Sequence, residues 1–199
     1  MRKIVVASNN PGKLRELQAM LGPLGFDAIA QSEFRFPEAE EPHDTFLENA
    51  LAKARHASRA TGLPALSDDS GLCVAALGGE PGVHSAYFAG REGTRVERDA
   101  RNNAKLVELL RAHEDRAAFY YCVLVLLRSP ADPTPIVADG RWHGAMVLEP
   151  HGAGGFGYDP YFVPREGSRT AAELTPEEKN RASHRGKALA ALAARLKEA

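Results

Sequence analysis

The longest unbroken apolar run in this chain of 199 residues is Ala117–Leu127. A transmembrane helix needs about 20 such residues, so this run is too short to cross a bilayer. It predicts a buried strand over Ala118–Leu127. Strand and helix patterns alternate before this strand, and further strand patterns follow it at Ile136–His143 and Met146–Glu149. That order predicts an α/β protein with a mixed sheet, folded as one domain over residues 1–199.

Turn residues and helix caps divide the rest of the chain. Thr45 is followed three residues later by Glu48, the pattern of a capping box at a helix start. The expected strands are Lys3–Ala7, Phe26–Ala30 and Leu63–Ser67, and the expected helices are Lys13–Leu21, Thr45 to about Ala60, one from Thr94, one from Thr175 and a last one that Ser183 caps.

The charge balance and the cysteines exclude several classes of protein. The chain has 25 Lys and Arg against 26 Asp and Glu, which gives a formal net charge of -1. A general nucleic-acid-binding protein carries a clear basic excess, so an anionic ligand has to be held by a local cluster. The two cysteines, Cys73 and Cys122, lie in apolar stretches. We interpret them as buried free thiols, which favours a reducing, cytoplasmic location.

The first candidate site is the turn Ser8-Asn9-Asn10-Pro11-Gly12-Lys13, between the first strand and the first helix. A helix start offers unpaired backbone N–H groups, and together with the ammonium of Lys13 they make a ready anion site. The turn is not a P-loop, because Ala7 stands where that motif needs Gly and Leu14 where it needs Ser or Thr. An ordinary strand–helix turn with a solvated lysine is the alternative.

The second candidate is Asp68-Asp69-Ser70-Gly71, at the predicted end of a strand. Two adjacent carboxylates repel each other, so a hard cation or nearby Lys and Arg side chains must stabilise them. One of the two can also act as a general base on water. A solvated turn is the alternative, since Asp, Ser and Gly are turn residues. The apolar residues on both sides of the motif favour the functional interpretation.

Two weaker signals precede this motif. Glu38, Glu40 and Glu41 make an acidic run in a loop, which is either solvated or a second source of metal ligands. Lys53 lies on the polar face of the helix that follows, a face that normally meets solvent.

The last third of the chain carries a possible base-binding group. Gly154–Pro160 combines glycines with Phe156, Tyr158 and Asp159. Glycines let a backbone approach a ligand, and an aromatic ring can stack on a nucleobase. The alternative is a loop whose aromatic residues fill the core. Lys179 and the segment Ser183-His184-Arg185-Gly186 add basic groups near a helix start, where a cap with surface charge is the simpler explanation.

Together and in this order, the motifs resemble those of the inosine triphosphate pyrophosphatase family, and most of all its bacterial dITP/XTP pyrophosphatases. The resemblance runs from Ile4 through Gly186. It rests on Ser8–Lys13, Thr45-Phe46-Leu47-Glu48-Asn49-Ala50, Asp68–Gly71, Pro81-Gly82-Val83-His84-Ser85-Ala86, Gly154–Pro160 and Ser183–Gly186.

This resemblance implies a two-lobed α/β fold with a long mixed sheet and a central substrate cleft. It implies hydrolysis of ITP, dITP or XTP to the monophosphate and pyrophosphate, with Mg²⁺ as cofactor, which cleanses the nucleotide pool. It further implies a homodimer. With the charge balance, the cysteines and the short apolar run, we expect a cytoplasmic protein that binds neither nucleic acid nor a membrane.

The resemblance also implies roles for single residues. Asp69 is expected to be the general base, and Glu40 and Asp69 to hold Mg²⁺ with Asp68 nearby. The residues expected to contact the triphosphate are Ser8, Asn9, Asn10, Pro11, Gly12, Lys13, Lys53 and Ser70. Those expected to receive the nucleotide, chiefly its base, are Phe156, Gly157, Tyr158, Asp159, Lys179, His184 and Arg185.

One position departs from the family pattern. Tyr87-Phe88 stands where members commonly carry Arg-Tyr, and Arg91 or Arg95 could substitute for the missing basic group. Two other functions stay open. One is a pyrophosphatase for modified pyrimidine nucleoside triphosphates. The other is a nucleotide-binding module without turnover, against which the several acids beside a polyanion site argue.

Overall fold

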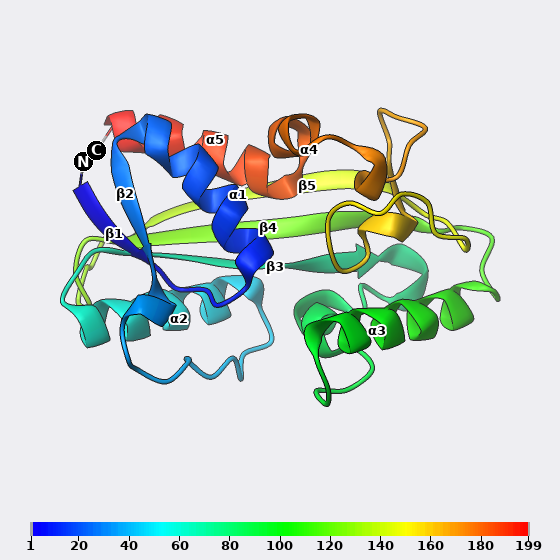
Figure 1. Ribbon diagram of the computed structural model, residues 1–199, viewed down its shortest axis with the longest axis horizontal. Coiled ribbons are helices and arrows are strands. Elements are labelled where there is room, and N and C mark those ends of the chain that lie inside the picture. Colours follow the sequence, from blue (N-terminus) through cyan, green and yellow to red (C-terminus); the bar gives the residue numbers. More distant parts are fainter. Residues whose placement is uncertain (1, 199) are drawn as a thin grey trace. The chain divides into compact units, whose positions relative to one another are not determined.

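The computed structural model of the protein describes residues 2–198 (Figure 1). Its strands are β1 (Arg2–Val6), β2 (Phe26–Ala30), β3 (Ala65–Val74), β4 (Ala117–Leu127), β5 (Ile136–Met146) and β6 (Phe162–Pro164). Its helices are α1 (Pro11–Leu21), α2 (Phe46–Thr61), α3 (Arg95–Leu110), α4 (Pro176–Ala182) and α5 (His184–Glu198). The caps predicted at Thr45, Thr94 and Thr175 are confirmed, since each hydroxyl accepts a hydrogen bond from the backbone N–H three residues on.

The strands form one six-stranded sheet in the order β2-β1-β3-β4-β5-β6. β1 pairs in parallel with both β2 and β3, whereas β5 and β6 are antiparallel. The sheet is therefore mixed, which confirms the predicted α/β class. No helix in the described part of the chain is long and apolar enough to cross a membrane.

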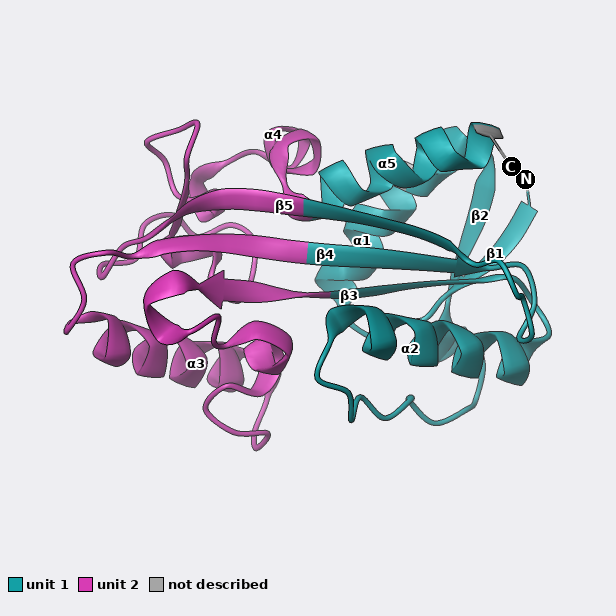
Figure 2. Ribbon diagram, turned by 180° about the vertical axis from the view of Figure 1, so that it is seen from behind, with its two compact units in different colours: residues 1–69, 122–140, 185–199 teal, residues 70–121, 141–184 magenta. Residues whose placement is uncertain are grey.

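The chain divides into two compact units, coloured separately in Figure 2. Unit 1 comprises the described parts of residues 1–69, 122–140 and 185–199, and unit 2 comprises residues 70–121 and 141–184. The divisions fall within β3, β4 and β5 and at the first residue of α5. That residues 1–199 act as one domain stays a prediction.

Unit 1 has a core on each face of its strands. Ile4 and Val6 pack with α1 and α5, whereas Val5 packs with Ala57 of α2, because successive side chains of β1 point to opposite faces. In Figures 1 and 2, α1 and α5 lie on one face of these strands and α2 on the other. The first residues of α1 and α5 are thus brought to the same face of β3.

Unit 2 has an aromatic core. Trp142 of β5 and Phe162 of β6 are fully buried there, together with Tyr120 of β4 and Leu106 of α3. This core supports the Gly154–Pro160 loop, whose Tyr158 is buried in it. The two cysteines are free as predicted, with Cys122 buried and Cys73 half-buried.

The predicted strand end at Asp68–Gly71 is wrong, because β3 runs through all four residues. Turn residues lie in the middle of a buried strand here because both carboxylates are paired with cations, as described below. Residue type alone favoured a turn, and the tertiary ion pairs overrode it.

The strand predicted at Ile136–His143 is present but continues to Met146 as β5, and the separate strand predicted at Met146–Glu149 is wrong. Gly144 does not interrupt it. A Cβ at that residue would lie 2.2 Å from the carbonyl oxygen of Val163. The glycine is therefore required for the close approach of β6, a short strand that the sequence patterns did not predict.

Candidate active site

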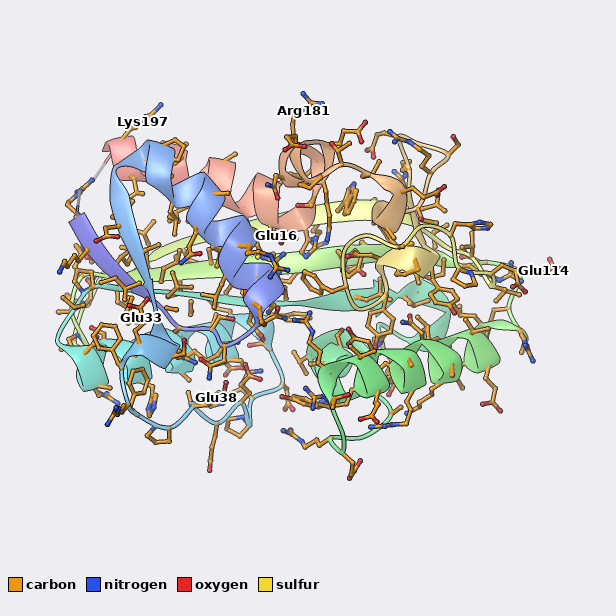
Figure 3. All side chains as sticks on the ribbon, viewed as in Figure 1. Glu16, Glu33, Glu38, Glu114, Arg181 and Lys197 are labelled. Atoms are coloured by element: carbon orange, nitrogen blue, oxygen red, sulfur yellow. The ribbon has the colours of Figure 1, made fainter. Side chains whose placement is uncertain are left out.

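Asp68 lies at the centre of a buried ion network in unit 1. Its carboxylate meets Lys13 Nζ at 2.9 Å and Arg185 Nη2 at 3.1 Å, and its side chain is 0% exposed. Lys13 lies in the first turn of α1 and Arg185 in the first turn of α5. Glu16, labelled on α1 in Figure 3, also pairs with Arg185. The network therefore joins one strand to the starts of two helices.

Charge keeps Asp68 ionised. Burial raises the pKa of this carboxyl, but the charges of Lys13, Arg185 and Lys53 outweigh burial and hold its pKa well below the usual range. The thiol of Cys122 donates to Asp68 Oδ2 over 3.6 Å. Burial and the Asp68 charge raise the pKa of Cys122, so it stays a protonated donor.

Asp69 points to the other face of β3, where α2 lies. Its Oδ1 accepts a hydrogen bond from Lys53 Nζ at 2.9 Å, and the same ammonium binds Glu41. Burial raises the pKa of Asp69. The charges of Lys53 and Lys13 lower it and that of Glu41 raises it, and the net pKa lies above the ordinary value. Asp69 is therefore the less compensated carboxylate of the pair, and the better proton acceptor.

The Ser8–Lys13 turn is held by its own side chains. Asn10 Oδ1 accepts hydrogen bonds from the backbone N–H groups of Gly12, at 3.0 Å, and Lys13, at 3.2 Å. Ser8 Oγ accepts one from the backbone of Asn10. Asn10 thus caps α1, and the turn presents the Lys13 side chain beside β3.

The acidic run lies on the loop between η2 (Gln31–Glu33) and α2. Glu38, labelled in Figure 3, binds Asn9, and Glu41 binds Lys53. Glu40, the expected metal ligand, is exposed. Within residues 2–198, no three His, Cys, Asp or Glu side chains are gathered as a metal site. Of this acidic run, Glu41 is the residue that shares a cation with Asp69, since both carboxylates pair with Lys53.

Unit 2 brings together the expected base-binding residues. Asp159 is 3% exposed, and its Oδ2 accepts hydrogen bonds from Lys179 Nζ at 2.8 Å and from the backbone N–H of Phe156 at 2.7 Å. Lys179 Nζ also lies 4.7 Å from the centre of the Phe156 ring. One carboxylate therefore fixes both the aromatic loop and the lysine.

His184 completes this group through an aromatic stack. Its ring lies 4.8 Å from that of Tyr120, nearly parallel at 11°. The Tyr120 hydroxyl donates to Asp159 Oδ1 at 3.3 Å. Burial and the Asp159 charge raise the pKa of Tyr120 well above its usual value, so it remains a donor.

Ser70 and Arg185 differ from the other expected residues in their placement. Ser70 is half-buried on β3 and belongs to unit 2. Arg185, expected at the base, belongs to unit 1 and is bound to Asp68 and Glu16.

Sequence patterns missed a stripe of α3 that holds the Gly154–Pro160 loop. Asp99 Oδ2 accepts a hydrogen bond from the backbone N–H of Gly157 at 3.1 Å, and Asn103 Nδ2 donates to its carbonyl at 2.9 Å. Arg95 lies over the Phe156 ring, 4.6 Å from its centre. The signal was present, since residues 95, 99 and 103 recur at the spacing that places side chains on one helix face.

A protein-family model described as Ham1 family matches residues 4–195 of this chain. The chain belongs to the Ham1 family. A dITP/XTP pyrophosphatase of Nitrosomonas europaea is 59% identical over 100% of this chain and 96% of the relative. One of Burkholderia pseudomallei is 62% identical over 98% of this chain and 94% of the relative. These names confirm the resemblance identified from the motifs.

Solved Ham1 structures share the fold. The HAM1 protein of Coxiella burnetii superposes with a TM-score of 0.90 at 49% identity and covers 100% of both chains. The Ham1 protein of Staphylococcus aureus gives 0.85 at 36% identity over 99% of both. Membership of the Ham1 family thus holds for the whole length of the chain.

Proposed function

We propose that this chain hydrolyses dITP, XTP and ITP to the nucleoside monophosphate and pyrophosphate. The observation that carries the proposal is the Asp68–Asp69 pair of β3. One carboxylate is neutralised by Lys13 and Arg185, and the other has a raised pKa beside Lys53. The pyrophosphatase names of the relatives support the same reaction.

In the proposed reaction, Asp69 accepts a proton from the water that attacks the α-phosphorus. Charge then builds on the oxygen that leaves with pyrophosphate. Lys53 and Lys13 stabilise that charge as fixed ammonium groups, with the Ser8–Lys13 turn and Ser70 beside the triphosphate. Arg185 holds the Asp68 carboxylate in place, in contrast to the base contact expected from the resemblance.

Mg²⁺ fits the donor set of this site. In nucleotide enzymes it is usually held by one or two carboxylates together with substrate phosphates. Asp69 and Glu41 already share one cation, the Lys53 ammonium. We therefore propose that Asp69 holds Mg²⁺ with a glutamate of the loop, with Glu41 favoured over Glu40 and with Asp68 nearby. A bound Mg²⁺ supplies charge stabilisation to the phosphate oxygens.

Glutamate-to-glutamine variants test this ligand set. We expect Glu41→Gln to raise the Mg²⁺ concentration for half-maximal activity on the order of 10-fold, because a ligand charge is lost. Glu38→Gln, on the same loop, is the matched control and should change it little. Mn²⁺ binding measured by EPR gives a readout independent of turnover. If Glu40→Gln raised this Mg²⁺ concentration more than Glu41→Gln does, Glu40 and not Glu41 would be the metal ligand.

The base is proposed to bind in unit 2. Phe156 offers a ring for stacking, and Gly157, Tyr158 and Asp159 shape the loop around it. Hypoxanthine and xanthine carry a carbonyl at C6, where adenine carries an amino group. The ammonium of Lys179 and the ring of His184 can donate to that carbonyl, and two facing donors disfavour ATP. The arrangement supports a purine with a C6 carbonyl.

Pyrophosphate release from a panel of purine and modified pyrimidine nucleoside triphosphates, with Mg²⁺ present, tests the proposal. dITP, XTP and ITP are expected to be turned over far faster than ATP and GTP. Preference for a modified pyrimidine nucleoside triphosphate, or binding without turnover, would contradict it. The homodimer and the cytoplasmic location stay predictions, and sedimentation would test the first.

A further inference from the structure

The Phe156 ring carries two cations. Lys179 Nζ lies 4.7 Å from its centre and Arg95 Cζ lies 4.6 Å from it. Lys179 is tightly held, since its side chain is 9% exposed and its ammonium binds Asp159 at 2.8 Å. Arg95 differs, because its side chain is 32% exposed and its Nε lies 3.8 Å from Asp99. Of the two cations, Arg95 is therefore the more exposed to a ligand.

The backbone beneath this contact is fixed. Asp99 and Asn103 bind the N–H and the carbonyl of Gly157, so α3 and the Phe156 loop keep a constant register. Arg95 lies one helical turn before Asp99 on the same face. A change in the Arg95 side chain alone can therefore open or close the space over the ring, while the loop stays in place.

We propose that Arg95 is a further base-binding residue, whose guanidinium plane stacks on a purine held against Phe156. The proposal rests on the proposed function, since it needs a purine in unit 2. A guanidinium is planar and stacks on aromatic rings, which an ammonium cannot do. Two layers in van der Waals contact need about 7 Å or more between guanidinium and ring. Arg95 therefore swings outward from its present 4.6 Å when the base enters.

This contact selects among purines. Xanthine carries carbonyls at both C2 and C6 and loses a ring proton more readily than hypoxanthine does. A cation stacked on a base that carries more negative charge is held more strongly. Arg95 is therefore expected to favour XTP over dITP. Arg91, the other residue considered as a substitute for the family's common arginine, lies over the Tyr87 ring at 4.4 Å and not over Phe156.

Steady-state kinetics of Arg95→Met with XTP and dITP test the proposal. We expect KM for XTP to rise about 5- to 30-fold, KM for dITP to rise less, and kcat to change less than about 2-fold. Arg95→Lys keeps the positive charge but lacks the planar guanidinium, so its KM for XTP should lie between those of wild type and Arg95→Met. Arg98→Met is the matched control, because Arg98 lies on the same helix over the Tyr87 ring. It should leave both KM values unchanged.

Calorimetric binding of the products XMP and dIMP gives a readout independent of turnover. We expect Arg95→Met to weaken the binding of XMP more than the binding of dIMP, with an unchanged melting temperature. Equal binding to wild type and Arg95→Met, or equal losses in Arg95→Met and Arg98→Met, would overturn the proposal. Failure of the wild-type protein to release pyrophosphate from XTP and dITP would instead overturn the proposed function, and the binding data would still decide the role of Arg95.

Discussion

Asp69→Asn is expected to lower kcat for dITP by at least about 10²-fold, the usual scale for loss of a general base. The amide cannot accept the proton of the attacking water, although it can still accept the hydrogen bond from Lys53. Binding should be affected less than turnover, because one negative charge facing the triphosphate is removed. The measurement is pyrophosphate release at saturating dITP and Mg²⁺.

The control for this variant is Asp44→Asn, which removes an exposed carboxylate from the loop before α2. It should retain the wild-type kcat. Melting temperatures of both variants exclude unfolding as the cause of a loss. A near wild-type kcat for Asp69→Asn would remove Asp69 from the role of base.

The largest expected effect on stability belongs to Asp68. Asp68→Asn should lower the free energy of unfolding by about 3–5 kcal/mol, because removal of one partner leaves the buried cation of Arg185 under-compensated. Urea denaturation measures the change. Glu178→Gln is the matched control, since Glu178 pairs with Arg169 at the surface, where both side chains are more than one-third exposed. That variant should leave the free energy of unfolding nearly unchanged, because an exposed ion pair is screened by solvent.

The pH dependence of this difference has a definite sign. The pKa of Asp68 is lowered on folding, so its ion pairs stabilise the protein above the unfolded-state pKa of about 3.9. The stabilisation is lost as pH falls from there through the folded-state pKa. The difference in free energy of unfolding between wild type and Asp68→Asn should therefore be constant near neutral pH and shrink below about pH 4. A gap that persists unchanged in strong acid would assign the stabilisation to packing instead.

Local signals were enough for most elements but not for β3, β5 and β6. Helix caps at Thr45, Thr94 and Thr175 depend on residues three positions apart, so the sequence alone locates them. The Asp68–Gly71 segment depends on Lys13, Lys53 and Arg185, which are distant in sequence. Gly144 depends on Val163 in the same way. No local pattern contains these contacts.

The candidate site also divides into residues that local motifs identify and contacts that depend on residues distant in sequence. The motifs identified Lys13, Lys53, Asp159 and Lys179 as candidates, but not their partners. The choice of Glu41 beside Lys53 depends on how the loop lies against α2, where His56 binds the carbonyl of Pro37 at 2.7 Å. A run of similar acids does not encode that path.

The two-residue period of β3 also constrains how the length of this gene product can vary. Asp68 faces the cations of α1 and α5 because it is one residue away from Asp69, which faces α2. Deleting or inserting one residue between Ala65 and Asp68 would exchange the two faces. The neutralised carboxylate would then meet Lys53, and the reactive one would be buried between Lys13 and Arg185. Insertions and deletions among relatives should therefore spare this strand and gather in loops away from the site, such as residues 128–135 between β4 and β5, where a change of length does not exchange the faces of β3.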